Sequence, residues 1–296
     1  MKQAGLQCRV LNVQPRAPVS EAYIKISGAA DLLRELFWHA ANDWSLSVHT
    51  NGHNVKSWLI AFVCGFAAQV GPGATLTVHS GMAPAYLQGG WRWRRTVARM
   101  SCLLYDRVVC VNEEIAEAIV SLGIPKHHLE VKPAYVQVEP APASIPEGLE
   151  KWMAERAPLI SMTLSFRREY GFELLVKAIA VLRRRHPKLG CVVMGGGEDR
   201  EEARRLLERQ EMTEAVLLAG DLAHDLCLAV IARSSVFVRP TLADGDSTSV
   251  REAAALGIPV VASNVGRRPE GALLFEAGDR DGLVGQVEHV LALGNP

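Results

Sequence analysis

The sequence lacks an excess of charge of one sign. Its 296 residues include 32 Lys and Arg and 32 Asp and Glu, so the formal net charge at pH 7 is zero. A protein that binds nucleic acid through the phosphate backbone needs an excess of basic side chains. We therefore expect no nucleic-acid partner, although single basic segments can still bind anionic surfaces.

Long apolar runs and paired cysteines are missing as well. The longest uncharged apolar stretch runs from Trp58 to Ala68. It is shorter than the roughly 20 residues that cross a bilayer, and the N-terminus has no signal-peptide pattern. The six cysteines include no C-x-x-C pair, which favours reduced thiols over disulfides or zinc. These absences predict a soluble cytoplasmic protein that binds no metal.

Short apolar runs alternate with segments of helical periodicity along the whole chain. The expected strands are 8–13, 45–49, 74–79, 107–111 and 129–132 in the first half, and 159–164, 191–194, 216–219, 236–238 and 260–262 in the second. The expected helices are 28–41, 57–69, 91–104 and 113–122, then 172–185, 200–210, 225–233, 250–256 and 281–293. This alternation predicts an α/β fold with parallel sheets, in which ligands bind at the carboxyl ends of the strands.

A segment rich in proline separates the two halves. Five prolines stand among small residues here: Pro133, Pro140, Pro142, Pro146 and Pro158. Such composition is typical of linkers. We predict an N-terminal Rossmann-like domain over residues 1–140, a linker over 141–157 and a C-terminal Rossmann-like domain over 158–296.

The most informative stretch is 236–263, which reads VFVRPTLADGDSTSVREAAALGIPVVAS. Its pattern predicts a strand, a loop, a helix that ends at Gly257 before Pro259, and a second strand. The small residues of the loop lead into the helix N-terminus, where unpaired N–H groups and the helix dipole favour an anion. The residues expected at this N-terminus are Ser247, Thr248, Ser249 and Val250.

Two acidic residues of this stretch are candidates for ligand contacts. Asp244 precedes the helix and Glu252 lies in its first turn, so a phosphate held at the helix end would place its sugar and ribose hydroxyls near both carboxylates, which accept hydrogen bonds. Ser249 and Glu252 also match the S-x-x-E capping box. The spacing alone therefore leaves two interpretations of Glu252, a ligand contact and a helix cap.

The stretch resembles the donor-binding segment of the family 4 retaining glycosyltransferases. That family has a Glu, seven residues, a second Glu, and a helix that ends in G-x-P-V-V-A-S. Here Asp244 replaces the first Glu, Glu252 is the second, and GIPVVAS follows at 257–263. The match continues through Gly271 to Phe275 and to Gly278-Asp279.

The resemblance implies a GT-B fold, with two Rossmann-like domains of parallel sheets and a cleft between them. It implies a nucleotide-diphosphate sugar donor on the second domain, an acceptor on the first, and transfer with retention of configuration. Asp244 would hold sugar hydroxyls and Glu252 the ribose. No cofactor and no metal are implied, because the helix dipole and guanidinium groups stabilise the leaving diphosphate.

Three further groups are candidates by the same resemblance. His79 ends a strand in TVHSG, where the family has a histidine that faces the sugar. Arg167 and Arg168 lie in a loop where the family places an Arg and a Lys on the diphosphate, although the strictly aligned residues, Ser165 and Tyr170, are not basic. The glycine-rich turn after strand 191–194 matches the family's G-x-G and consists of Gly195, Gly196, Gly197 and Glu198.

A basic helix start with two tryptophans, Trp91 to Arg99, has no counterpart among these donor motifs. Cationic segments with tryptophan bind anionic membrane surfaces. We expect the protein to be cytoplasmic with peripheral contact to the inner face of the membrane through this segment. The acceptor is expected to be a glycan or other saccharide, a lipid or lipid-linked molecule, or a small molecule.

Two rival functions remain open. The chain begins where the family's second strand would be, without the usual first strand and glycine loop, and ends before the family's last helices, so an inactive or truncated GT-B protein that binds a sugar nucleotide or a partner is one alternative. A GT-B sugar-nucleotide epimerase, which would need no separate acceptor, is the other.

Overall fold

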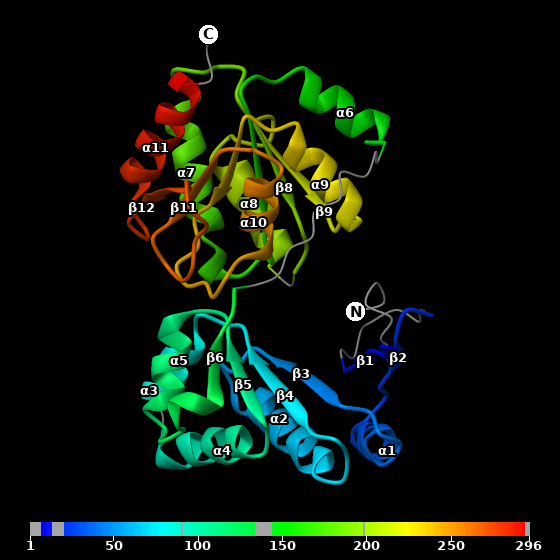
Figure 1. Cartoon of the computed structure of the whole chain (residues 1–296). Helices are drawn as coiled ribbons and strands as arrows, with labels where there is room; N and C mark the ends of the chain where they lie inside the picture. Colours follow the sequence, from blue (N-terminus) through cyan, green and yellow to red (C-terminus); the bar gives the residue numbers. More distant parts are fainter. Residues whose placement is uncertain (1–6, 14–20, 90, 134–143, 198, 294–296) are drawn as a thin grey trace. The chain divides into compact units, whose positions relative to one another are not determined.

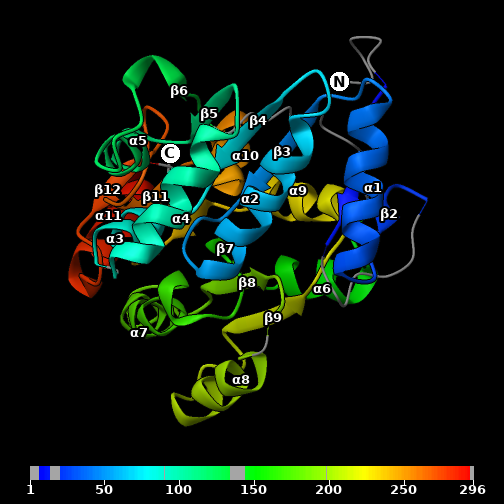
Figure 2. The same cartoon turned by 90° about the horizontal axis from the view of Figure 1, so that it is seen from below.

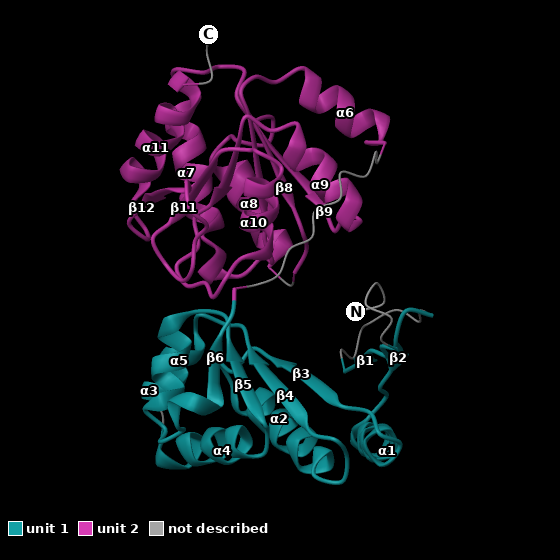
Figure 3. Cartoon of the chain, in the orientation of Figure 1, with its two compact units in different colours: residues 1–132 teal, residues 133–296 magenta. Residues whose placement is uncertain are grey.

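The computed structural model describes residues 7–13, 21–89, 91–133, 144–197 and 199–293. The chain forms two compact units, residues 1–132 and 133–296 (Figure 3). Each unit has a parallel sheet and its own apolar core.

Unit 1 is built on a four-stranded parallel sheet with the order β3-β4-β5-β6 (Figure 1). Its strands are β3 (Leu46–Thr50), β4 (Ala74–Val78), β5 (Arg107–Cys110) and β6 (Leu129–Val131). Its helices are α1 (Ala29–Ala41), α2 (Val55–Ala68), α3 (Ala83–Gln88), α4 (Arg92–Leu103) and α5 (Glu113–Val120). The short strands β1 (Leu11–Asn12) and β2 (Ile24–Lys25) pair only with each other.

One face of this sheet carries the core of unit 1. Burial alternates along β4, where Ala74, Leu76 and Val78 are buried and the two threonines between them are partly exposed. The buried face packs against α2, α3, α4 and α5. Asn54 and Asn112 begin α2 and α5, because the side chain of each accepts a hydrogen bond from the backbone N–H three residues later.

Unit 2 is built on a six-stranded parallel sheet with the order β12-β11-β10-β7-β8-β9. Its strands are β7 (Leu159–Thr163), β8 (Gly190–Met194), β9 (Val216–Gly220), β10 (Val236–Arg239), β11 (Val260–Ser263) and β12 (Leu273–Phe275). Its helices are α6 (Glu147–Ala154), α7 (Phe172–Leu182), α8 (Arg200–Arg209), α9 (His224–Ala232), α10 (Thr248–Ala255) and α11 (Arg280–Leu293).

Both faces of the second sheet are covered. Side chains of α7, α8 and α11 pack in one apolar cluster, and those of α6, α9 and α10 pack in another. Figures 1 and 2 show the backbones of these helices around the sheet from two directions. Every residue of β8, β10 and β11 is buried. This two-sided burial explains why these strands read as unbroken apolar runs rather than as alternating patterns.

The division of the chain differs from the predicted one. The first unit ends at Lys132 rather than at residue 140, and α6 lies inside the predicted linker 141–157. Met153 of α6 is 5% exposed and belongs to the core cluster of unit 2. Pro146 is the N-cap of α6, a position near a helix start where proline is tolerated.

The remaining differences are short elements. The sequence pattern did not predict β2, α3 or β12, which are two, six and three residues long. The strand expected at 8–13 is only the two residues of β1 and does not join the main sheet. The long strands and helices lie within a few residues of the predicted ranges.

Candidate functional site

The second sheet has a topological switch point between β7 and β10. The chain enters the sheet at β7, adds β8 and β9 on one side, and then returns to add β10, β11 and β12 on the other. Ligands of open parallel sheets bind outside the carboxyl ends of the strands at such a point. Thr163 and Arg239 are the last residues of the two central strands.

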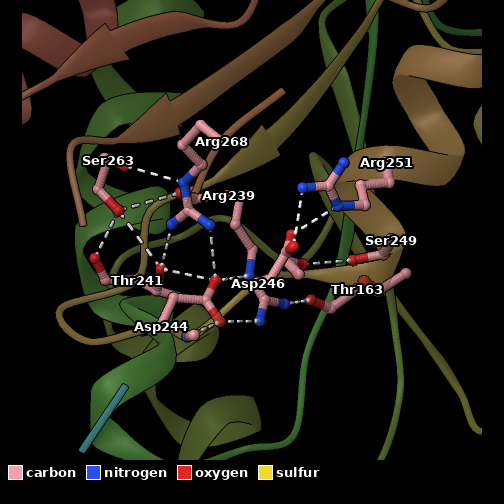
Figure 4. Close-up of polar contacts among 11 residues, drawn as sticks. Thr163, Arg239, Thr241, Asp244, Asp246, Ser249, Arg251, Ser263 and Arg268 are labelled. Atoms are coloured by element: carbon pink, nitrogen blue, oxygen red, sulfur yellow. Dashed lines mark hydrogen bonds and ion pairs between the residues drawn. The ribbon is translucent and has the colours of Figure 1, made fainter. Parts of the chain in front are cut away.

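Arg239 connects the two strands at the switch point. Its Nη1 donates to the backbone oxygen of Thr163 at 2.9 Å, and its Nε donates to Oδ2 of Asp244 at 3.0 Å (Figure 4). The guanidinium carbon lies 4.9 Å from the ring centroid of Tyr170, within the range of a cation–π contact. Only 9% of the Arg239 side chain is exposed.

A second arginine reaches the same carboxylate from the segment after β11. Arg268 donates from Nη1 to Oδ2 of Asp244 at 3.0 Å, from Nη2 to Oγ1 of Thr241 at 3.1 Å and from Nε to the backbone oxygen of Ser263 at 3.1 Å. Its side chain is 4% exposed. Figure 4 shows both guanidinium groups pointing toward Asp244.

The structure gives Asp244 partners other than the predicted sugar hydroxyls, and its contact with a sugar stays a prediction. Besides the two arginines, Asp244 accepts hydrogen bonds from Thr241 Oγ1 and from the backbone N–H of Gly245. These donors occupy the roughly four lone-pair positions of a carboxylate. Burial raises the pKa of the Asp244 carboxyl, but the charges and hydrogen bonds of Arg239 and Arg268 outweigh burial and hold the pKa below its usual value.

Asp246 is the second carboxylate of the loop, and the spacing D-x-D with Asp244 escaped the sequence analysis. Arg251 of α10 donates to it through Nε at 2.6 Å and through Nη2 at 2.7 Å, and the Asp246 side chain is fully buried. Both carboxylates of the pair are thus bound by guanidinium groups. No group of three or more His, Cys, Asp or Glu side chains in the described part of the chain could hold a metal ion.

The loop ends at α10, as predicted from the small residues. Ser247 is the N-cap, and α10 begins at Thr248 with no side-chain hydrogen bond at its cap. Ser247 and Ser249 contact each other through their hydroxyls at 3.2 Å, and Val250 is buried in the core. The N–H groups of this first turn are therefore those of a helix start without a side-chain cap.

Glu252 does not form the capping box. It lies in α10 with 10% of its side chain exposed, and its Oε1 is 2.7 Å from Nε2 of His224 at the start of α9. The cap interpretation of Glu252 is therefore wrong. The described residues make no hydrogen bond to its other oxygen, Oε2, which leaves an acceptor at the carboxyl edge of the sheet.

The glycine turn after β8 is required by close packing of the backbone. Gly195 and Gly197 have φ values of 126° and 145°, which favour glycine. A Cβ on Gly195 would lie 1.9 Å from the backbone oxygen of Leu164, and one on Gly196 would lie 2.5 Å from Oδ2 of Asp221. Packing thus accounts for these glycines, and their contact with a donor stays a prediction. Glu198 lies outside the described residues.

Arg167 and Arg168 are exposed in the loop after β7. They line a cavity of about 510 Å³ together with charged side chains of α7 and α8, among them Glu173, Lys177 and Arg209. Neither arginine joins the cluster around Asp244. Their predicted contact with a diphosphate stays a prediction.

His79 follows β4 in unit 1 and pairs with a histidine that sequence analysis missed. Its Nε2 is 2.8 Å from Nδ1 of His49 in β3, and the two rings are stacked. Burial, and then the charge of His49, lowers the pKa of His79 to about 4, and burial lowers that of His49. The pair is therefore uncharged near neutral pH. The nearby His53 contacts the hydroxyl of Ser80 through Nδ1 at 3.1 Å.

The basic segment 91–99 forms the start of α4 and exposes its tryptophans. Trp91 is 77% exposed and Trp93 47%. A small cavity of about 200 Å³ on the same helix is lined by Arg92, Arg95 and Arg99. The described helices include none with the length and apolar composition that crossing a membrane requires.

Comparison with known protein families defines the class of this α/β protein. A family model described as Glycosyl transferases group 1 matches residues 157–292, and one described as Glycosyltransferase Family 4 matches residues 31–139. The two matches cover the sheets of both units. The chain belongs to the group 1 glycosyltransferases of family 4, and the resemblance found in residues 236–263 is confirmed.

Similar proteins of known name are themselves glycosyltransferases. The chain is 30% identical over 176 residues to the GDP-mannose-dependent alpha-(1-6)-phosphatidylinositol monomannoside mannosyltransferase of Mycobacterium tuberculosis, a match of 56% of this chain and 46% of that protein. It is 29% identical over 100 residues to the phosphatidylinositol N-acetylglucosaminyltransferase gpi3 subunit of Schizosaccharomyces pombe, which covers 34% of this chain and 22% of that protein. The chain thus spans less than half the length of these relatives.

Solved structures support the fold. Anabaena HepE in complex with UDP-glucose superposes with a TM-score of 0.70 at 16% identity, over 91% of this chain and 75% of HepE. The N-terminal domain of Candida albicans trehalose-6-phosphate phosphatase superposes with a TM-score of 0.68 at 11% identity, over 90% and 68%. The predicted GT-B class, with two Rossmann-like domains of parallel sheets, is confirmed.

The structure adds side chains that sequence reasoning missed, among them His49, His224, Arg239 and Arg268. Arg239 and His49 lie near the ends of predicted strands, a position at which polar residues merit attention in a parallel sheet. No sequence signal connects Arg268 with Asp244 or His224 with Glu252, because these partners are 24 and 28 residues apart.

Proposed function

We propose that this protein is a retaining glycosyltransferase that moves a sugar from a nucleotide-diphosphate sugar to an acceptor hydroxyl. In that reaction the bond between the anomeric carbon and the diphosphate oxygen breaks, a bond from that carbon to the acceptor oxygen forms, and the acceptor proton is released. The leaving group is a nucleoside diphosphate. The main task of the protein is to stabilise the negative charge that develops on the diphosphate.

The proposal rests on the surroundings of Glu252, a nearly buried carboxylate with only one oxygen paired among the described residues. A carboxylate with 10% of its side chain exposed is costly to bury unless its oxygens are paired. His224 occupies one oxygen. We propose that the other accepts hydrogen bonds from the ribose hydroxyls of a donor whose phosphates bind at the N-terminus of α10, where Ser247, Thr248, Ser249 and Val250 supply the helix end.

The remaining roles follow from the resemblance to the family. Arg167 and Arg168 are proposed to neutralise part of the diphosphate charge, and Gly195, Gly196 and Gly197 to let a ligand approach the backbone. His79 is proposed to contact the sugar. No metal is needed for this mechanism, because the helix end and the guanidinium groups provide the positive charge.

The relatives narrow the choice of substrates. The mycobacterial relative is named for GDP-mannose and a phosphatidylinositol monomannoside, the yeast relative for N-acetylglucosamine transfer to phosphatidylinositol, and HepE is in complex with UDP-glucose. We propose a GDP or UDP sugar as donor and a lipid-linked acceptor.

A lipid acceptor would require contact with a membrane surface. Between Asp43 and Asp106 the chain contains no Asp or Glu, and α4 in this stretch exposes Trp91 and Trp93 beside its arginines. This composition favours anionic lipid, because aromatic rings insert at the headgroups while guanidinium groups bind the phosphates. We propose that the segment from Trp91 to Arg99 contacts the inner face of the membrane peripherally.

The donor site is tested by calorimetric titration of the whole chain with UDP, GDP and their hexoses, repeated with Glu252→Ala. We expect one nucleotide to bind, and the variant to lose at least tenfold in affinity while remaining folded. Glu147→Ala, which removes an exposed acid from α6, is the matched control and should bind as the original chain does.

The outcomes separate the rival functions. Nucleotide binding without transfer to any acceptor would favour a non-catalytic sugar-nucleotide-binding protein. Conversion of the donor to its epimer in the absence of an acceptor would favour an epimerase. Unchanged binding by folded Glu252→Ala would overturn the assignment of the donor site to α10.

A further inference from the structure

The cluster at the switch point carries more positive than negative charge. Its five charged side chains are Arg239, Arg251, Arg268, Asp244 and Asp246, which leaves one positive charge that no carboxylate of the cluster balances. The guanidinium groups of Arg239 and Arg268 are more than nine-tenths buried. A buried charge without a counter-ion is unfavourable, so a bound anion would stabilise the arrangement.

The two arginines also retain unused hydrogen-bond donors. An arginine has five N–H groups. Arg239 uses three of them, toward Asp244 and the backbone of Thr163, and Arg268 uses three, toward Asp244, Thr241 and the backbone of Ser263. Each guanidinium therefore has two N–H bonds without an acceptor among the described residues.

The cluster lies at the switch point of the second sheet, where ligands of open parallel sheets bind. Arg239 ends β10 and bridges to the end of β7, the two strands between which the sheet changes direction. Asp244 lies in the loop that leads to α10. An anion at this point would meet both guanidinium groups and the start of α10.

We propose that Arg239 and Arg268 bind the diphosphate of the donor, and that Asp244 is a positioning residue that holds the two guanidinium groups in place. This inference rests on the proposed function for the identity of the ligand. It assigns the positive charge to β10 and the segment after β11, whereas the loop after β7 has Ser165 and Tyr170 where the family has basic residues. The ring of Tyr170 instead lies against the Arg239 guanidinium.

The charge of the cluster can be changed in steps. Arg268→Met lowers it by one unit, Asp244→Asn raises it by one, and the double variant Asp244→Asn/Arg268→Met restores the original value. Arg280→Met removes an arginine that is half exposed on α11 and is the matched control. Thermal unfolding establishes which variants are folded.

The experiment is calorimetric titration with UDP, GDP, uridine, guanosine and inorganic pyrophosphate. We expect Arg268→Met to weaken diphosphate and pyrophosphate binding by at least tenfold and to leave nucleoside binding unchanged. Asp244→Asn should weaken pyrophosphate binding less than Arg268→Met does, because both guanidinium groups remain but lose the carboxylate that holds them. The double variant should bind pyrophosphate no more tightly than Arg268→Met, because the Arg268 guanidinium is still missing. Equal affinities of the original chain and folded Arg268→Met would overturn the proposal.

A measurement on the unmodified chain covers the case in which Arg268→Met fails to fold. Pyrophosphate should slow amide hydrogen exchange in residues 239–247 and 263–268. Protection confined to the loop 165–171 would overturn the proposal and assign the diphosphate to Arg167 and Arg168.

The same titrations separate this proposal from the proposed function. If pyrophosphate binds with an affinity that depends on Arg268 but neither nucleotide binds, the anion site is supported and the proposed glycosyltransferase function is contradicted. If the affinity for a nucleotide is lowered by Glu252→Ala but unchanged by Arg268→Met, the proposed function is supported and the cluster has only a structural role. Loss of UDP-sugar binding but not of UDP binding in Asp244→Asn would restore the sugar contact of Asp244 and overturn its positioning role.

Discussion

His49 and His79 share one hydrogen bond, and their surroundings disfavour a charge on either ring. Burial lowers the pKa of His79 to about 4, with a further contribution from His49. An unfolded histidine has a pKa near 6.5. Between these values the unfolded chain binds more protons than the folded one, so the pair reduces the stability of unit 1 as the pH falls from about 6.5 toward 4.

Replacing His79 tests this pH dependence. His79→Gln should flatten the loss of stability between pH 7 and pH 5, a difference of about 1 to 2 kcal/mol after allowance for partial exposure. The measurement is chemical unfolding of the original chain and the variant over that pH range. His127→Gln, at an exposed histidine, should keep the original profile. Parallel profiles for His79→Gln and the original chain would contradict the lowered pKa.

The two acidic residues of the donor motif have opposite surroundings. Asp244 and Glu252 fit the family's spacing equally well, yet Asp244 accepts hydrogen bonds from two arginines, Thr241 and Gly245, whereas one oxygen of Glu252 has no partner among the described residues. The sequence predicted their location at the carboxyl edge of the sheet. It could not predict their partners, because Arg268 and His224 reach them through the packing of other elements rather than through local pattern.

At the scale of elements, long segments were predictable and boundaries set by packing were not. The apolar runs of β8 and β10 are buried on both faces and identify strands directly. The prolines on either side of α6, Pro146 and Pro158, favoured a linker, although Leu149, Trp152 and Met153 at helical spacing contact the core of unit 2. The composition therefore predicted a linker, whereas the segment forms a helix that three apolar residues anchor to the core.

The role of α6 can be tested by removing its buried anchor. Met153→Ala should lower the stability of the chain by about 2 to 4 kcal/mol, because it leaves a cavity in a packed cluster. Lys151→Ala, at an exposed position of the same helix, should change stability by less than about 0.5 kcal/mol. Denaturant unfolding measures both. Equal stability of the two variants would mean that residues 147–154 behave as a linker.

At the scale of the whole molecule, the net charge is zero, but the acidic side chains are unevenly distributed along the chain. The carboxylates are absent from the stretch between Asp43 and Asp106, while α8 of unit 2 carries Glu201, Glu202 and Glu208 among its arginines. A neutral chain can therefore present a cationic and aromatic surface on α4. Attraction to anionic lipid falls off within a Debye length, so the local charge decides it and the total does not.

Vesicle binding tests this uneven distribution. The chain should sediment with vesicles of phosphatidylglycerol and phosphatidylcholine, and much less with phosphatidylcholine alone. Arg92→Gln/Arg99→Gln should weaken binding by about 30-fold, since each basic residue near the surface contributes about 1 kcal/mol, and Trp91→Ser/Trp93→Ser should weaken it even at low salt. The control Arg204→Gln/Arg205→Gln removes the same charge from α8. If both arginine pairs have the same effect, binding follows total charge, and α4 has no special role at the membrane.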